Sequence, residues 1–249
     1  MRVAAIYDIH GNLPALEAVL EDVRRAQADL IVVGGDVLPG PMPVEAIACL
    51  QGVGDIPVQF IQGNGDRAVL EQLAGVETDN LPEPVREVVR WVARQLHPEQ
   101  ERLLASWPQT RRVEIRGLGE VLFCHATPRS DTEIFTRLTP EERLLPVFTG
   151  LDATVVVCGH THMQFDRTIG RLRVVNAGSV GMPFGEPGAY WLLLGPDVQL
   201  RQTPYDLARA AERIRATSYP QAQEFAAQDV LCPRSESEML EIFAKAELR

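Results

Sequence analysis

The chain has 249 residues, 45% of them hydrophobic, which is enough apolar material for one large core or two small ones. Its 34 acidic and 24 basic residues give a formal charge of −10, which disfavours long nucleic acid as the main partner because phosphate backbones are held by positive surface. The sequence does not open with a basic and then apolar leader, and no apolar run reaches the ~18 residues of a membrane helix. The four cysteines form no Cys-x-x-Cys pair, as is usual for reduced thiols. We therefore expect a cytoplasmic protein without a membrane span.

The first predicted element is an apolar strand over residues 3–7, which ends directly before Asp8 and His10. Apolar residues then recur at helical spacing over residues 13–23, and Asn12 is the predicted N-cap of this helix. The chain thus begins with a strand, a polar loop and a helix.

Two further apolar strands, over residues 30–33 and 58–61, also end in polar loops. The first is closed by Gly34-Gly35-Asp36, where two glycines allow the backbone to approach another group closely. The second is followed by Gly63-Asn64-Gly65-Asp66, whose composition is that of a turn. Three successive strands therefore end in residues that can bind a ligand.

Residues 67–112 form a first insertion, in which a predicted amphipathic helix over residues 85–96 is stopped by Pro98. A hairpin over 113–116 and 121–123 follows and leads to His125 and Arg129. A second insertion, 126–150, contains a helix for which Thr139-x-x-Glu142 resembles a capping box.

The most informative stretch is residues 154–164. Three consecutive valines indicate a strand buried on both faces, and Gly159 ends it before His160 and His162. In an extended chain, this spacing of two places both imidazoles on one face. They would lie past the carboxyl end of a core strand, where open α/β sheets bind their ligands.

Strands over residues 172–175, 190–194 and 198–201 and a small-residue loop over 176–181 complete the pattern. The tail, residues 204–249, is predicted to hold two helices, about 205–216 and 235–246. No internal repeat or low-complexity linker divides the chain, so we predict one domain over residues 1–249.

Seven residues lie directly after apolar strands, and they include four of the five histidines of the chain: Asp8, His10, Asp36, Asn64, His125, His160 and His162. Imidazoles and oxygen ligands without a thiolate suit Mn²⁺, Fe²⁺, Co²⁺, Ni²⁺ or Zn²⁺ in an open site rather than a closed structural zinc site. Seven ligands are too many for one ion. They suit two ions ~3.5–4 Å apart that share a bridging carboxylate, an arrangement that clamps a phosphoryl group during displacement.

The motifs Asp8-x-His10, Gly35-Asp36, Gly63-Asn64-x-Asp66, an isolated His125 and Gly159-His160-x-His162, in this order, resemble those of the calcineurin-like metallophosphoesterases. Residues 8–12 and 176–181 are similar to the small bacterial and archaeal phosphodiesterase branch, and the resemblance extends to about residue 200. It implies an α/β fold of four layers, α-β-β-α, in which helices flank two mixed sheets and a dinuclear metal site lies at the carboxyl ends of the strands. It also implies two divalent ions, with Mn favoured and Fe, Zn, Ni or Co as alternatives. One ion would be held by Asp8, His10 and His162, the other by Asn64, His125 and His160, and Asp36 would bridge them.

One position departs from the family pattern. Most members have a histidine after the motif's asparagine, where it is thought to assist the leaving group, and this chain has Gly65. Without that acid, an ester with a poor leaving group should react worst, so the resemblance favours a phosphodiesterase that acts on small-molecule phosphoesters.

In the predicted mechanism, a metal-bridging hydroxide attacks phosphorus while the ions and Asn64 stabilise the developing charge. The predicted catalytic residues are Asp36, Asn64, His125 and Arg129, although Arg129 suits a phosphate clamp and a surface arginine equally well. Asn12 and Asp66 are expected to orient the ligands.

Other functions stay open at this point. A phosphomonoesterase, a protein phosphatase or a dinucleoside polyphosphate hydrolase could use the same scaffold. A non-catalytic interaction module is disfavoured by the complete ligand set, and a nuclease is disfavoured by the charge. The sequence leaves open the natural substrate and a homo-oligomeric state.

Overall fold

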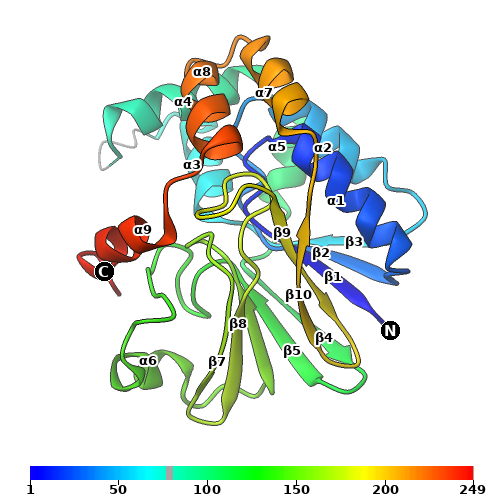
Figure 1. Cartoon of the computed structure of the whole chain (residues 1–249), viewed down its shortest axis with the longest axis vertical. Helices are drawn as coiled ribbons and strands as arrows, with labels where there is room; N and C mark the ends of the chain where they lie inside the picture. The colour runs from blue at the N-terminus through cyan, green and yellow to red at the C-terminus, as the bar shows by residue number, and fades with distance from the viewer. Residues whose placement is uncertain (77–80, 249) are drawn as a thin grey trace.

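The computed structural model describes residues 1–76 and 81–248, and two five-stranded mixed sheets form its centre (Figure 1). The first sheet has the order β10-β9-β1-β2-β3. Its strands are β1 (Val3–Ile6), β2 (Leu30–Val33), β3 (Val58–Phe60), β9 (Ala189–Leu194) and β10 (Val198–Thr203). β1, β2 and β3 run parallel to one another, whereas β9 runs antiparallel to both β1 and β10.

The second sheet has the order β4-β5-β6-β8-β7. Its strands are β4 (Thr110–Ile115), β5 (Gly119–Cys124), β6 (Val155–Cys158), β7 (Phe165–Ile169) and β8 (Leu172–Asn176). β5, β6 and β8 are parallel, and the edge strands β4 and β7 are antiparallel to their neighbours.

Helices lie on the outer face of each sheet, and further helices near the carboxyl terminus pack on those of the first layer. They are α1 (Leu13–Arg25), α2 (Pro43–Gln51), α3 (Asn64–Leu73), α4 (Glu83–Gln95), α5 (Pro98–Ala105), α6 (Glu141–Phe148), α7 (Leu207–Arg215), α8 (Ala222–Phe225), the π-helix η1 (Ala226–Leu231) and α9 (Glu236–Ala244). Figure 1 shows α1 and α2 beside the first sheet, α6 beside β7 and β8, and the carboxyl-terminal helices α7 and α8 near α1 and α4. No described helix has both the length and the apolar character that a membrane crossing requires.

Side chains that alternate along the strands enter different cores, because successive residues of a strand point to opposite faces. In β1, Ala5 packs between the two sheets, and Ile6 packs on the other face in the core that includes residues of α1. In β6, Val157 faces the space between the sheets, whereas Val156 packs with Phe148 of α6. The four-layer α-β-β-α arrangement is therefore confirmed.

The predicted strands are present, and the hairpin joins β4 and β5. The helices expected over 205–216 and 235–246 correspond to α7 and α9. Ser235 is the N-cap of α9, because its hydroxyl accepts the Glu238 N–H at 3.3 Å. The strand β7, the helices α5 and α8 and the π-helix η1 were not predicted. They are short, and β7 has only two buried residues, at its ends.

Two local predictions were wrong. Gly63-Asn64-Gly65-Asp66 does not form a turn but begins α3: Gly63 is the N-cap, and its N–H donates to Asp66 three residues on, at 3.0 Å. Thr139 does not cap α6, whose N-cap is Pro140. The Thr139 hydroxyl instead donates to Glu247 at 2.7 Å, so a tertiary contact has taken the predicted capping side chain.

Candidate metal centre

The seven predicted ligands lie at the carboxyl ends of five strands. β1 is followed by Asp8 and His10, β2 by Asp36, and β3 by Asn64. In the second sheet, β5 is followed by His125, and β6 by His160 and His162. Because these strands are parallel within each sheet, their carboxyl ends lie at one edge of each sheet. Donors that are far apart in the sequence therefore meet at one place.

The backbone of these loops is not extended, contrary to the expectation from the spacing of two. Five of the seven residues have positive φ angles: Asp8 (52°), His10 (46°), Asp36 (50°), His160 (66°) and His162 (57°). The left-handed region costs a residue with a side chain about 1–2 kcal/mol, and such conformations cluster at functional sites. The left-handed backbone of these five residues, rather than a shared strand face, therefore sets the direction of their side chains.

The first donor group consists of Asp8, His10 and His162. Nε2 of His162 lies 3.4 Å from Oδ1 of Asp8 and 3.2 Å from Nε2 of His10. Nδ1 of His10 donates to the carbonyl of Pro39 at 3.2 Å, and Nδ1 of His162 donates to that of Met182 at 2.7 Å. With their protons on Nδ1, both rings turn an unprotonated Nε2 toward the same point, as metal-ligating histidines do.

The second donor group lies around His125, whose Nδ1 donates to the carbonyl of Gly34 at 3.0 Å. Nε2 of this ring is 3.0 Å from the amide oxygen of Asn64. The same amide atom lies 2.9 Å from Nδ1 of His160. Three acceptor atoms at this spacing attract a cation, whereas with the amide turned over its N–H would donate to both rings.

Asp36 lies between the two groups. Its Oδ2 is 3.8 Å from Nε2 of His10, and its Oδ1 is 3.6 Å from Nε2 of His125. The carboxylate is 4% exposed and accepts the Gly65 N–H at 2.7 Å. Its position suits a carboxylate that bridges two ions.

The acidic and basic groups of the site shift one another's pKa values. Burial alone would raise the pKa of Asp8, but the neighbouring His162, His125 and His10 lower it to about 2. Burial likewise opposes the charge on His125, yet Asp36 and Asp8 raise its pKa, and Asp8 does the same for His162. These carboxylates thus favour positive charge in both donor groups.

Burial lowers the pKa of His160 to about 4, and His125 adds to the effect. Burial also lowers the pKa of His10, against the attraction of Asp36. Both rings are therefore neutral at pH 7, and only the neutral imidazole can bind a metal ion.

One buried atom shows that the donors fit a cation. Oδ1 of Asp8 is buried and has no hydrogen-bond partner, whereas Oδ2 accepts the His160 N–H at 2.9 Å. An unpaired buried carboxylate oxygen costs several kcal/mol unless a positive charge faces it. Together with the ring nitrogens around it, this oxygen suits a divalent ion of borderline hardness.

Further residues hold the ligand loops in place. Asp66 accepts the N–H groups of Asp36, Leu38 and Gly63 at 2.9, 3.0 and 3.0 Å. Burial and the carboxylate of Asp36 raise the pKa of Asp66 to about 8, against these N–H donors. Asp66 therefore positions the backbone of the central ligand, as expected. Asn12 caps α1 and also donates to the Gly181 carbonyl at 2.9 Å.

Two supporting residues were not predicted. Ser179 donates to the carbonyl oxygen of Asp8 at 2.7 Å, and Asn176 donates to that of Gly159, directly before the two histidines, at 2.6 Å. Both lie in the small-residue loop over 176–181. Their roles depend on contacts with distant segments, so only the resemblance of this loop to a phosphodiesterase motif pointed to them.

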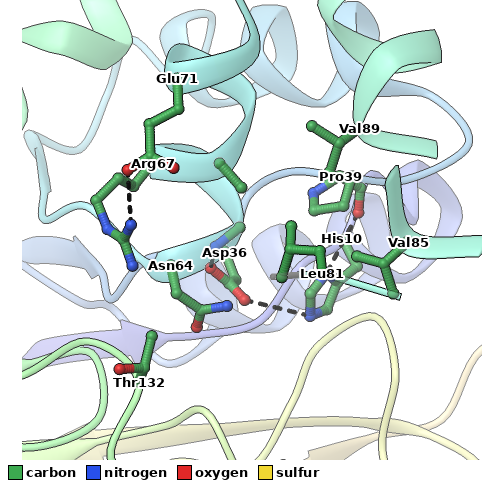
Figure 2. A pocket seen from close by; sticks show the side chains of 12 residues that line it. His10, Asp36, Pro39, Asn64, Arg67, Glu71, Leu81, Val85, Val89 and Thr132 are labelled. Carbon is green, nitrogen blue, oxygen red and sulfur yellow. Dashed lines mark hydrogen bonds and ion pairs between the residues drawn. The ribbon is translucent and has the colours of Figure 1, made fainter. Parts of the chain in front are cut away.

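A cavity of about 220 Å³ opens beside the ligands (Figure 2). His10, Asp36 and Asn64 line its floor, and its walls differ in character. One side carries Arg67 and Glu71 from α3; the other is apolar and is formed by Pro39, Leu81, Val85 and Val89.

The two arginines near the site differ in position. Arg129, the predicted phosphate clamp, has an exposed side chain that donates to Glu133 at 2.6 Å and lies in a small hollow beside His125. Arg67 was not predicted, yet it lies in the cavity with the ligands. It donates to Asp131 at 2.7 Å and to Glu71 at 2.8 Å. A helix that begins at Asn64 would have indicated it, because residues three apart share a helix face.

The two facing sheets, with candidate metal-ligand groups at their strand ends, define an α/β protein with a candidate metal centre. The sequence model of the calcineurin-like phosphoesterase superfamily domain matches residues 1–195. The chain belongs to this family, and it is accordingly a metal-dependent phosphoric ester hydrolase.

Individual proteins resemble this chain in sequence or in fold. An uncharacterised protein of Methanocaldococcus jannaschii is 28% identical over 240 residues, which are 88% of this chain and 94% of that protein. The crystal structure of a metallophosphoesterase from Sphaerobacter thermophilus has a TM-score of 0.69 and 25% identity, and the match covers 91% of this chain and 98% of that one. A hypothetical protein from Pyrococcus horikoshii OT3 has the same fold, with a TM-score of 0.80 at 20% identity over 94% of this chain and 99% of that one.

Proposed function

We propose that the protein is a phosphodiesterase that uses two divalent metal ions, Mn²⁺ being favoured. One ion would be held by Asp8, His10 and His162, the other by Asn64, His125 and His160, and Asp36 would be shared between them. When bound, the ions activate a water molecule and neutralise charge on the phosphoryl oxygens. The side chains of the protein place the ions, and the amide of Asn64 also contacts the phosphoryl group.

The environment of Gly65 carries the choice of a diester. A β-carbon at this position would overlap the backbone carbonyl oxygen of Leu38 and would lie 2.9 Å from Cδ of Pro39. The place of the family's histidine is therefore filled by the backbone of a neighbouring loop. Among the described residues that line the cavity, the only imidazole belongs to the ligand His10. Esters whose leaving group must receive a proton are disfavoured.

The test compares the hydrolysis of a bis-aryl phosphodiester with that of the matching aryl phosphomonoester, with Mn²⁺ added. We expect kcat/KM for the diester to be higher than for the monoester by at least about 10-fold. Loss of a general acid lowers a rate by at least ~10²-fold, and the good aryl leaving group of the test compounds makes that loss smaller. Equal or greater monoesterase activity would contradict the proposal. Addition of a chelator is the control and should abolish both activities.

We retain Arg129 as a proposed phosphate contact and add Arg67. Both arginines are paired with carboxylates, Arg129 with Glu133 and Arg67 with Asp131 and Glu71. Only Arg67 lines the cavity beside the proposed metal ligands. An arginine binds phosphate through paired N–H donors. Arg67 is therefore the better-placed of the two for the phosphoryl group of a bound substrate.

A further inference from the structure

The wall of the cavity opposite Arg67 is apolar, although it lies beside the metal ligands. Leu81 lies just before α4, Val85 lies in the first turn of this helix, and Val89 lies one turn further along. The side chain of Val85 is 39% exposed, which is unusual because the other valines of this helix, Val88, Val89 and Val92, are buried. In Figure 2, Leu81, Val85 and Val89 lie on the side of His10, away from Arg67.

Several features show that this apolar wall belongs to a binding cavity. Pro39 lies beside His10 and is part of the apolar wall. Its carbonyl accepts the Nδ1–H of His10, and its ring lines the cavity beside the valines, so no charged side chain of the described residues separates His10 from the wall. Apolar surface with a few converging polar groups is typical of small-molecule sites. The ordered change from metal ligands to apolar wall matches a substrate with a charged centre and an apolar substituent.

The volume limits what can enter. Pockets for drug-sized ligands measure about 300–1,000 Å³, and this cavity measures about 220 Å³. It can therefore take one ester substituent, while the second substituent of a diester must point away from it. The polar side is occupied by Arg67 and its two carboxylates, so the substituent must lie on the apolar side.

We propose that Leu81 and Val85 select phosphodiesters with one apolar substituent about the size of an aryl ring, which packs on this wall while Arg67 faces the phosphoryl oxygens. This inference rests on the proposed function, because it names the substrate class of the same site. The wall binds the substituent by removing apolar surface from water. An alkyl ester as small as methyl gains little from it.

The experiment measures the binding of phenylphosphonate and methylphosphonate to the Mn²⁺-loaded full-length protein by calorimetry. Both compounds present the same phosphonate to the metal ions and to Arg67, so their difference reports on the substituent alone. We expect phenylphosphonate to bind at least ~10-fold more tightly, since small apolar groups in a pocket are worth 10-fold or more. Equal affinities would overturn the proposal.

Val85→Ser should weaken phenylphosphonate binding by ~5–10-fold and leave methylphosphonate binding unchanged. The matched control is Leu145→Ser on α6, because Leu145 is 37% exposed and does not line the cavity; it should change neither affinity. If Val85→Ser lowers thermal stability, Val85→Thr keeps the side-chain shape and provides the same comparison. A Val85 variant that weakens both compounds equally would overturn the proposal.

Hydrolysis of a bis-aryl phosphodiester by the same proteins separates this inference from the proposed function. A preference for phenyl that depends on Val85, in a protein that hydrolyses no diester, would support the apolar subsite and refute the diesterase. Diester hydrolysis without any preference for phenyl would support the diesterase and refute the subsite.

Discussion

The carbonyl oxygen of Leu38 occupies the space into which a side chain at position 65 would point, and a β-carbon on Gly65 would overlap it. Gly65 does not have a positive φ angle, so its absence of a side chain is a matter of space and not of backbone conformation. The loop after β2 and the N-terminus of α3 are packed directly against each other at this point. A histidine here would displace the loop that carries the ligand Asp36.

Gly65→Ala should therefore destabilise the protein, by about 1–3 kcal/mol, as is usual when a packed site is overfilled. Denaturant unfolding of the wild type and the variant measures the difference. Gly52→Ala is the control, because a β-carbon there has its nearest neighbour at 3.2 Å, the carbonyl oxygen of Ala48, and it should have a smaller effect. Wild-type stability of Gly65→Ala would show that the loop moves freely. In that case Gly65→His, which adds an imidazole as a proton donor, would be a fair test of general acid catalysis.

The wild-type protein should retain close to two divalent ions per chain after dialysis against metal-free buffer. Asp36→Ala should lose more metal than any other single ligand variant, because a bridging carboxylate serves both ions. Elemental analysis gives the stoichiometry. The control is Asp131→Ala, which removes a carboxylate that pairs with Arg67 and is not a proposed ligand. Full occupancy in Asp36→Ala would contradict a shared site.

His162 has a φ angle of 57°, which predicts a difference between two variants that both remove the imidazole. His162→Gly should be more stable than His162→Ala by about 0.5–1 kcal/mol, since alanine is strained in the left-handed region and glycine is not. Thermal unfolding in the presence of a chelator measures the difference, so that metal binding does not contribute. Both variants should keep about one tightly bound ion, that of the other donor group. A more stable alanine variant would show that the loop relaxes once the imidazole is removed.

Asp229, on η1, gives the stability a pH dependence. Burial raises its pKa from 3.8 to about 7, against the attraction of His162 and Arg234. Between these pH values, the folded chain keeps a proton that the unfolded chain releases, so this group's contribution to stability falls as the pH rises from about 4 to about 7.

Asp229→Asn removes that titration. Relative to the wild type, it should become more stable between pH 4 and pH 8, by at most about 4 kcal/mol, because one pKa unit corresponds to 1.36 kcal/mol. The side chain is only partly buried, so we expect about half of that limit. Unfolding free energies measured at both pH values with a chelator test this. The difference in unfolding free energy between Asp229→Asn and the wild type at pH 4 is the reference. If the same difference were found at pH 8, the pKa of Asp229 could not be raised in the folded protein.

The two arginines are separated by one pair of substitutions. Arg67→Gln should lower kcat/KM for a bis-aryl phosphodiester by ~10–100-fold, the range for a hydrogen bond to a charged group. Arg129→Gln should have a smaller effect, because that guanidinium is exposed and does not line the cavity. Steady-state kinetics at saturating Mn²⁺ gives both values. A larger effect for Arg129→Gln would mean that Arg129 is released from Glu133 when substrate binds.

The identity of the strands and of the residues that follow them could be predicted from local sequence alone. Runs such as residues 155–157 are apolar because both faces of the strand are buried, and this shows in the residue types without any knowledge of neighbours. The order of the ligand motifs also indicated the family, and hence the two facing sheets. The hydrophobic pattern of α4 likewise predicted a helix with one buried face.

Other features were decided by contacts between distant segments. The Thr139 hydroxyl is bonded to Glu247, 108 residues away, so its local capping pattern misled. Asn64 begins a helix because the Asp66 carboxylate accepts N–H groups from its own loop and from Asp36 and Leu38, which a four-residue pattern cannot reveal.

The spacing of His160 and His162 predicted that both imidazoles belong to one site, but it did not predict the direction of their side chains. Their φ angles are set by packing of the loop, where Asp8 accepts the His160 N–H and the carbonyl oxygen of Met182 accepts a hydrogen bond from Nδ1–H of His162. The sequence by itself thus indicated which residues are the candidate metal ligands. Only the tertiary structure determined which of their atoms face one another and which wall stands beside them, because a free side chain gains a fixed direction only from the groups that surround it.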